Sequence, residues 1–278
     1  MLYLLLSAFL YALNNFLWKV NITQLDTYGL VWSRATFTFA FSCIGVFLLA
    51  DPISQLKRAF LIDGWYYLIA CAFGLLGLVS MISGLKKGAL AQFSLFQALM
   101  AISAGMLISI IAQINLSTFI GAGLIITAFL IHLKINALTA TNEGWAWFFI
   151  MTACFLVSGF TNWYLVKQHA PIISILAQEF IVLAVFSVYA IFRPSKVFKL
   201  YKPNALRIGS FALVIFGAIY FGTLGLKITD PFLASITGLI SPLITASFGV
   251  LVLKEKWNWK HTTSFSLITL GIVLILIS

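Results

Sequence analysis

The sequence predicts an all-α polytopic membrane protein with ten transmembrane helices, and three observations lead to this fold class. Hydrophobic residues make up 62% of the chain and charged residues only 9%, whereas a soluble domain carries roughly a quarter charged residues. The apolar residues form repeated runs of about twenty residues, the length that a helix needs to cross a bilayer. These runs do not alternate every second residue, which excludes the strands of a membrane barrel.

Hydropathy and loop signals divide the chain into ten predicted spans joined by short connections. The chain enters an apolar run at once, with no basic segment and no cleavage signature before Lys19. We therefore expect residues 1–20 to be a retained span and not a signal peptide. The ten spans lie near 2–20, 28–50, 65–84, 89–111, 115–134, 144–166, 171–192, 208–227, 231–253 and 261–277.

Composition and motifs also narrow the class of function. The formal net charge of +10 comes from Lys and Arg in short loops, so it bears on membrane orientation and predicts no nucleic-acid partner. Cys43, Cys71 and Cys154 lie inside apolar runs and are predicted to be buried thiols. The histidines have no metal-ligand spacing, and the sequence has no nucleotide-binding loop or other enzyme signature. We expect no catalytic residue, no metal and no cofactor.

The ninth span has the composition of a helix packed inside a bundle. Asp230 and Pro231 form a helix-start signal. Gly238 and other small residues follow, and Pro242 lies near the middle of the run. Small residues and a central proline are typical of a helix that packs closely on its neighbours and bends beside a cavity. Gly238 and Pro242 are therefore predicted packing and hinge residues.

Residues 230–278 resemble the end of an EamA domain, the repeat unit of the drug/metabolite transporter superfamily. The features that carry the resemblance are Ser241-Pro242, the apolar run 243–253, Glu255 in the following turn, and a final helix at 262–277. The resemblance implies two inverted five-helix repeats around a central cavity. It also implies a secondary carrier for small metabolites, without enzymatic activity.

The two halves of the chain repeat short patterns at matching places. Each half has five predicted spans, an odd number, so the second copy is expected to insert upside down relative to the first. This predicts an EamA-like repeat at 1–136, a linker at 137–143 and a second repeat at 144–278. The first repeat lacks the proline, with Ala101 in its place, and lacks a Glu after Ile111. The matching pairs are Asn14 and Asn162, Lys19 and Lys167, Gly84-Leu85-Lys86 and Gly225-Leu226-Lys227, and Ser94 and Ser235.

Two charged residues lie within predicted spans, about two turns into the second and seventh. An ionised side chain in hydrocarbon costs at least ~2.5–3.5 kcal/mol, so Arg34 and Glu179 should face protein or water. Arg34 also matches an arginine that EamA repeats often carry in their second helix. One hypothesis is that Arg34 attracts a substrate carboxylate while Glu179 binds an amine or a coupling proton. The alternative is that each is a structural ion, paired or reaching toward the interface.

Uncharged polar and aromatic side chains form a second set of candidates for the cavity wall. Amides and hydroxyls can hydrogen-bond a polar solute, and aromatic faces can stack on a flat or cationic one. The alternative for each is a hydrogen bond between helices, which is common in membrane bundles. The set comprises Asn14, Asn15, Trp18, Ser83, Gln92, Gln97, Asn162, Trp163, Tyr164, Tyr220, Ser235 and Thr237.

These observations together predict a transporter of a small polar metabolite, with an amino acid or related zwitterion as the leading hypothesis and export as one direction. The lipid bilayer is an expected partner, and a proton is a candidate coupling ion. A lipid-linked flippase subunit and a membrane receptor or assembly partner remain alternatives. For orientation, the resemblance implies cytoplasmic termini, whereas the positive run 193–207 predicts the reverse.

Overall fold

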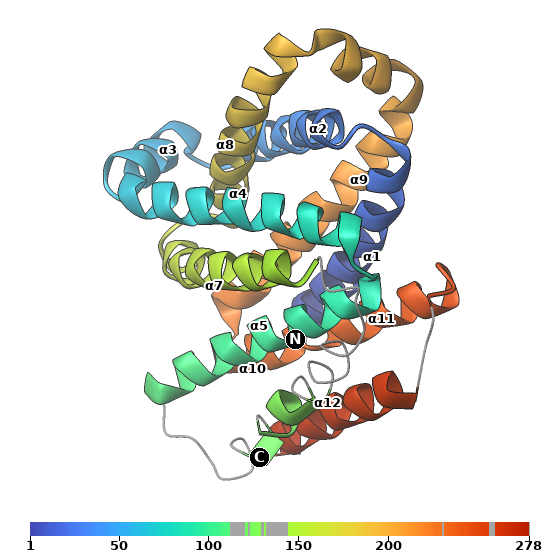
Figure 1. Cartoon of the computed structure of the whole chain (residues 1–278). Helices are drawn as coiled ribbons and strands as arrows, with labels where there is room; N and C mark the ends of the chain where they lie inside the picture. Colours follow the sequence, from blue (N-terminus) through green and yellow to red (C-terminus); the bar gives the residue numbers. More distant parts are fainter. Residues whose placement is uncertain are drawn as a thin grey trace.

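The computed structural model describes residues 1–111, 120–121, 123–128, 131, 144–229, 231–255 and 259–277, and the regular elements in these ranges are helices (Figure 1). The predicted fifth span, 115–134, lies mostly outside these residues, and the linker 137–143 lies wholly outside them. The helices are α1 (Leu2–Gln24), α2 (Thr27–Phe47), α3 (Pro52–Leu61), α4 (Gly64–Lys87), α5 (Leu90–Ile111), α7 (Trp145–Gln168), α8 (Pro171–Phe192), α9 (Pro194–Ile228), α10 (Pro231–Gly238), α11 (Ile240–Leu251) and α12 (Trp259–Ile277).

Six helical segments in the described residues are long and apolar enough to cross a membrane. Two shorter apolar helices, Leu90–Ala104 and Thr262–Leu274, add to them. The predicted class, an all-helical polytopic membrane protein, is therefore supported, while the number of ten spans stays a prediction. The six segments are Thr27–Phe47, Gly64–Lys87, Trp145–Gln168, Pro171–Phe192, Asn204–Ile228 and Leu233–Leu251.

Two segments that the hydropathy pattern predicts to be loops between spans are helical in the structure. The helix α3 begins after Asp51, whose carboxylate accepts a hydrogen bond from the Ser54 N–H at 3.3 Å, and Pro52 occupies its first turn. The helix α9 begins at Pro194, although its apolar part starts only at Asn204. Local capping and proline signals thus extend the helices beyond the hydrophobic runs that predicted them.

The predicted ninth span is divided into α10 and α11, which meet at Leu239. A proline has no N–H to donate and its ring crowds the carbonyl four residues earlier. For Pro242, that carbonyl belongs to Gly238, the last residue of α10. The break therefore falls where the proline removes the helix hydrogen bond.

Contacts between helix termini define two ends of the bundle. At the Lys19 end, the Lys19 ammonium near the end of α1 donates to backbone oxygens at the end of α4. At the Asp63 end, Asp63 before α4 contacts His169 after α7, and Lys167 donates to the Lys227 oxygen near the end of α9. The close approach of Gly225 to Leu4 places the start of α1 at the Asp63 end as well. Thus α1 runs antiparallel to α9, and α4 runs antiparallel to α7.

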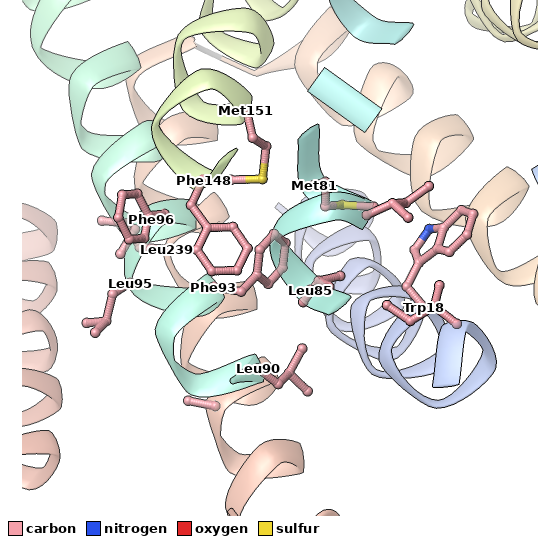
Figure 2. Close-up of a cluster of buried hydrophobic side chains, with 14 of the residues drawn as sticks. Trp18, Met81, Leu85, Leu90, Phe93, Leu95, Phe96, Phe148, Met151 and Leu239 are labelled. Carbon is pink, nitrogen blue, oxygen red and sulfur yellow. The ribbon is translucent and has the colours of Figure 1, made fainter. Parts of the chain in front are cut away.

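A group of buried side chains fills the interior near the Lys19 end (Figure 2). We call Trp18, Met81, Leu85, Phe93 and Phe148 the apolar seal, and each is at most 5% exposed. The ring centroids of Phe93 and Phe148 lie 5.6 Å apart, a separation typical of favourable aromatic pairs. The seal joins α1, α4, α5 and α7.

Candidate functional site

A cavity of about 460 Å³ lies in the centre of the bundle. Its wall is built by helices from both halves of the chain, α1, α2, α4 and α5 from the first and α7 to α11 from the second. Trp18, Met81 and Phe93 of the apolar seal form its boundary toward the Lys19 end. In the other direction the wall extends to Leu4 and Leu226, which lie close to the Asp63 end. The cavity is therefore closed at the Lys19 end and reaches toward the Asp63 end.

The two charged residues predicted from the sequence meet in the cavity wall. Arg34 Nη1 and Nη2 donate to the two carboxylate oxygens of Glu179 at 3.0 and 2.9 Å, and the two side chains are 3% and 1% exposed. Such a bidentate pair is among the stronger charge-assisted contacts in proteins. The Arg34 guanidinium also lies 5.8 Å from the centre of the Trp18 ring. Each charge thus has its counter-charge within the protein.

Helix caps position this pair. The Asp26 carboxylate accepts from the Gly29 N–H at 2.8 Å and fixes the start of α2. Pro171 starts α8. Arg34 and Glu179 each lie about two turns from these starts, and α2 packs against α8. Because α2 and α8 run antiparallel, their starts lie at opposite ends of the bundle, and the ion pair forms where the two helices pass each other.

Amides and hydroxyls of the cavity wall form two separate sets of hydrogen bonds. Asn15 Nδ2 donates to Gln97 Oε1 at 3.1 Å and to Thr245 Oγ1 at 3.4 Å, which links α1 to α5 and α11. Asn162 Nδ2 donates to Ser158 Oγ at 3.3 Å. The Ser158 hydroxyl in turn donates to the Ala70 oxygen at 2.8 Å, joining α7 to α4. Several wall amides are therefore interhelical links as well as surfaces of the cavity.

The structure distributes the predicted residues between the cavity wall and other places. Five of them do not line the cavity. The Ser83 and Thr237 hydroxyls donate to backbone oxygens within their own helices, and Gln92 accepts from the Ala89 N–H at the start of α5. Tyr164 contacts Asp63, and Tyr220 stacks on Phe216. The residues in the wall are Asn14, Asn15, Trp18, Arg34, Gln97, Asn162, Trp163, Glu179, Ser235, Gly238 and Pro242. Their roles remain predictions.

Sequence reasoning missed several wall residues that lie next to predicted ones. Tyr11 lies one helical turn before Asn14, and Gln178 directly precedes Glu179. Ser174 lies five residues before Glu179, and Ser241 directly precedes Pro242. Helical spacing from a known wall residue could have found Tyr11. No signal in the sequence marks Ser174.

At the Lys19 end, two charged side chains hold the turn between α4 and α5. Lys19 Nζ donates to the backbone oxygens of Leu85 and Gly88 at 2.6 and 2.7 Å. The Glu255 carboxylate accepts from the N–H groups of Leu90 and Ala91 at 2.7 and 3.0 Å. We call Lys19 and Glu255 the polar latch. The latch joins α1 and the segment after α11 to the turn between α4 and α5, which lies next to the apolar seal.

A glycine allows Glu255 to reach this turn. A Cβ atom on Gly249 would lie only 2.7 Å from the Glu255 carboxylate. Lys254, which precedes Glu255, adopts a φ of 53°, in the left-handed region. The chain after α11 therefore folds back along α11, against Gly249.

At the Asp63 end, a different group of polar side chains joins α4, α7 and α9. His169 Nε2 lies 2.7 Å from Asp63 Oδ2, and the Tyr164 hydroxyl donates to Asp63 Oδ1 at 3.5 Å. Lys227 Nζ donates to the His169 backbone oxygen at 3.2 Å. The helix termini at the two ends of the bundle are thus joined by different side chains.

A helical membrane bundle that encloses a cavity between two halves of its chain has the architecture of a membrane transporter. Residues 142–277 match the model described as the EamA-like transporter family. The second half of the chain is therefore an EamA-like domain of the drug/metabolite transporter superfamily, and the chain is an integral multi-pass membrane protein. The resemblance of the first half remains a prediction.

A solved structure described only as "Crystal structure of protein" has a TM-score of 0.68 with this chain at 15% sequence identity. The alignment covers 98% of this chain and 97% of that chain. At this identity the similarity shows the fold alone. No curated protein matches the chain.

Proposed function

We propose that this protein is a secondary transporter that moves a small metabolite across the membrane by alternating access to the central cavity. The cavity is the observation that carries this proposal. Its volume of about 460 Å³ falls within the roughly 300–1,000 Å³ of small-molecule sites. Residues from both halves of the chain line it, as expected of a site between repeats.

The helix contacts support an inverted repeat of 1–136 and 144–278 around the linker 137–143. When α1, α2, α4 and α5 are matched with α7, α8, α9 and the α10–α11 pair, the contact of α1 with α9 becomes the contact of α7 with α4. The same matching exchanges α2 with α8, and α5 with the α10–α11 pair, and each of these matched pairs is itself in contact. Matched helices also run in opposite directions, since α1 starts at the Asp63 end and α7 at the Lys19 end.

Alternating access requires the closed end to open. In this conformation the Lys19 end is closed by the apolar seal and the polar latch, and the cavity reaches toward the Asp63 end. The opposite conformation would separate α1, α4, α5 and α7 at the seal. The break between α10 and α11 provides a place where the second half can bend.

The hypothesis of a zwitterionic substrate requires Arg34 and Glu179 to separate. A substrate carboxylate would then take the place of Glu179 beside Arg34, and a substrate amine would take the place of Arg34. A coupling proton on Glu179 would weaken the pair in the same way. The export direction is part of this same hypothesis.

Flux through the purified chain tests the proposal. The chain is reconstituted alone in proteoliposomes loaded with a panel of radiolabelled amino acids and small metabolites, and their release is followed. We expect protein-dependent release that saturates with concentration. The matched control is a Gly159→Leu variant, whose side chain should fill the cavity and stop the release, because Gly159 lines the cavity and no atom of the described residues lies within 4 Å of its Cβ position. Absence of flux for the whole panel would favour a receptor or assembly partner.

A lipid-linked flippase is a second candidate because most residues in the cavity wall are apolar. An apolar wall fits an acyl or isoprenoid chain better than a fully polar solute. A scrambling assay distinguishes the two functions. Loss of leaflet asymmetry of a fluorescent lipid in proteoliposomes, without solute release, would support the flippase.

A further inference from the structure

The charge balance of the cavity wall bears on the class of solute it can hold. Among the described residues of the wall, only Arg34 and Glu179 are charged. Their side chains neutralise each other through two hydrogen bonds. A solute with a net charge would therefore enter an apolar wall without a free counter-charge. Moving an unpaired ion out of water is strongly unfavourable.

Aromatic and thioether side chains supply most of the large surfaces of the wall. Trp18 and Trp163 lie on α1 and α7, and Phe93, Phe155 and Phe160 lie on α5 and α7. Aromatic rings pack favourably against flat rings in offset or edge-to-face arrangements. Met81, Met100 and Met151 add flexible thioethers, which adapt to irregular apolar shapes. This composition fits a solute with a flat apolar body.

The remaining polar groups of the wall are uncharged donors and acceptors. Four wall residues each have a buried polar atom with no hydrogen-bond partner among the described residues; one is Arg34, through its Nε, and the other three are uncharged. Asn14 Oδ1 is an acceptor, Trp163 Nε1 is a donor, and Ser241 Oγ can be either. An unpaired buried polar atom costs free energy. A solute that carries both a donor and an acceptor, such as an amide, can reduce this cost where small movements expose these atoms.

We propose that the cavity selects an uncharged amphipathic solute with a flat ring and an amide-like polar group. The proposal rests on the function proposed above and names the substrate class of the same cavity. It differs from the zwitterion hypothesis because it leaves the Arg34–Glu179 pair intact in the bound state. The ring packs among the aromatic side chains, and the polar group meets the uncharged donors and acceptors.

A set of indole compounds that differ only in charge tests this proposal by equilibrium binding. Indole-3-acetamide is uncharged, indole-3-acetate is an anion, tryptamine is a cation and tryptophan is a zwitterion. Each is titrated into the purified chain in nanodiscs by calorimetry. We expect indole-3-acetamide to bind at least about tenfold more tightly than the other three.

Two variants separate binding in the cavity from partition into lipid. Gly159→Leu fills the cavity and should abolish the binding of indole-3-acetamide. Gly123→Leu is the matched control, because Gly123 is exposed, has no atom of the described residues within 4 Å of its Cβ position and is not among the described residues of the cavity wall. It should bind as the unchanged chain does.

Three results would overturn the proposed substrate class. These are equal or tighter binding of a charged or zwitterionic compound, no saturable binding of indole-3-acetamide, and binding of indole-3-acetamide that survives Gly159→Leu. Flux of a charged solute in the proteoliposome assay would leave the transporter function in place while rejecting this class. Binding without any flux would instead reject the transporter function and retain the site.

Discussion

Arg34 and Glu179, which are 145 residues apart in the chain, form a two-point ion pair between α2 and α8 with N–O distances of 3.0 and 2.9 Å. Both side chains are almost fully buried. The pair connects the two halves of the chain in the wall of the central cavity. Its removal should affect both stability and transport, and the two effects can be measured separately.

Loss of one partner of the pair should destabilise the protein more than loss of both. Arg34→Met leaves the Glu179 charge buried without a partner, which costs about 3–5 kcal/mol. The double variant Arg34→Met/Glu179→Met removes both charges and should recover most of this loss. The free energy of unfolding of the unchanged chain, the two single variants and the double variant is measured in detergent micelles by circular dichroism. Additive effects of the two substitutions would contradict a coupled pair.

Glu179→Gln tests the proposed proton site. Glutamine cannot take up or release a proton, and its amide is a weaker acceptor for Arg34 than a carboxylate. We expect slower flux in proteoliposomes and a flatter dependence of the rate on pH. Asn162→Asp, which adds a carboxylate elsewhere in the wall, serves as a comparison. An unchanged rate and pH dependence in Glu179→Gln would exclude Glu179 as the coupling site.

Lys19→Met should make the closed end of the bundle open more often. The substitution removes two hydrogen bonds from an ammonium to the α4–α5 turn, and bonds to charged groups contribute about 1.5–3 kcal/mol each. The readout is the rate at which a thiol reagent labels Leu90→Cys in a chain without its own cysteines, because Leu90 is fully buried beside the seal. We expect labelling to accelerate about fivefold or more.

Lys167→Met is the matched control for this experiment. Lys167 is the counterpart of Lys19 in the second half, but it makes an exposed hydrogen bond at the Asp63 end. Its loss should leave the labelling of Leu90→Cys unchanged. Equal acceleration by both substitutions would indicate general loosening and contradict a latch at the Lys19 end.

Gly84→Ala should destabilise the packing of α4 against α7. A Cβ atom on Gly84 would overlap the ring of Phe148, which is fully buried and has little room to move. Overpacking of this kind costs about 1–3 kcal/mol. Gly64→Ala is the control, since no atom in the described part of the chain lies within 4 Å of its Cβ position. Thermal unfolding that is equal in both variants would contradict this close approach.

Membrane orientation can be tested with topology reporters fused after residue 203 and at the C-terminus. Lys19, Lys86, Lys87, Arg193 and Lys254 lie near the Lys19 end, so the positive-inside rule predicts that this end faces the cytoplasm. Residue 203, in the first part of α9, should therefore report a cytoplasmic position. A reporter at the C-terminus should give the opposite side if the second half has five spans. A reversed result would place the Asp63 end in the cytoplasm.

Patterns that are local in the chain predicted much of this architecture. Runs of apolar residues gave most of the helices because a membrane span is a property of about twenty consecutive residues. Pro242 and Gly238 marked the break in the ninth span, since a proline acts on the carbonyl four residues before it. The starts of α3 and α9 were missed because caps and prolines, and not hydropathy, determine them.

The sequence by itself determined that this is a polytopic helical membrane protein whose second half is of the EamA type, and that Arg34 and Glu179 must face protein or water, because hydrocarbon excludes charges without partners. Only the tertiary structure decided that these two residues neutralise each other. It also placed Gln97 in the cavity wall and left Gln92 outside it, and brought Lys19 and Glu255 to one turn. These relationships join residues far apart in the chain, and only the packing of helices determines which side chains meet.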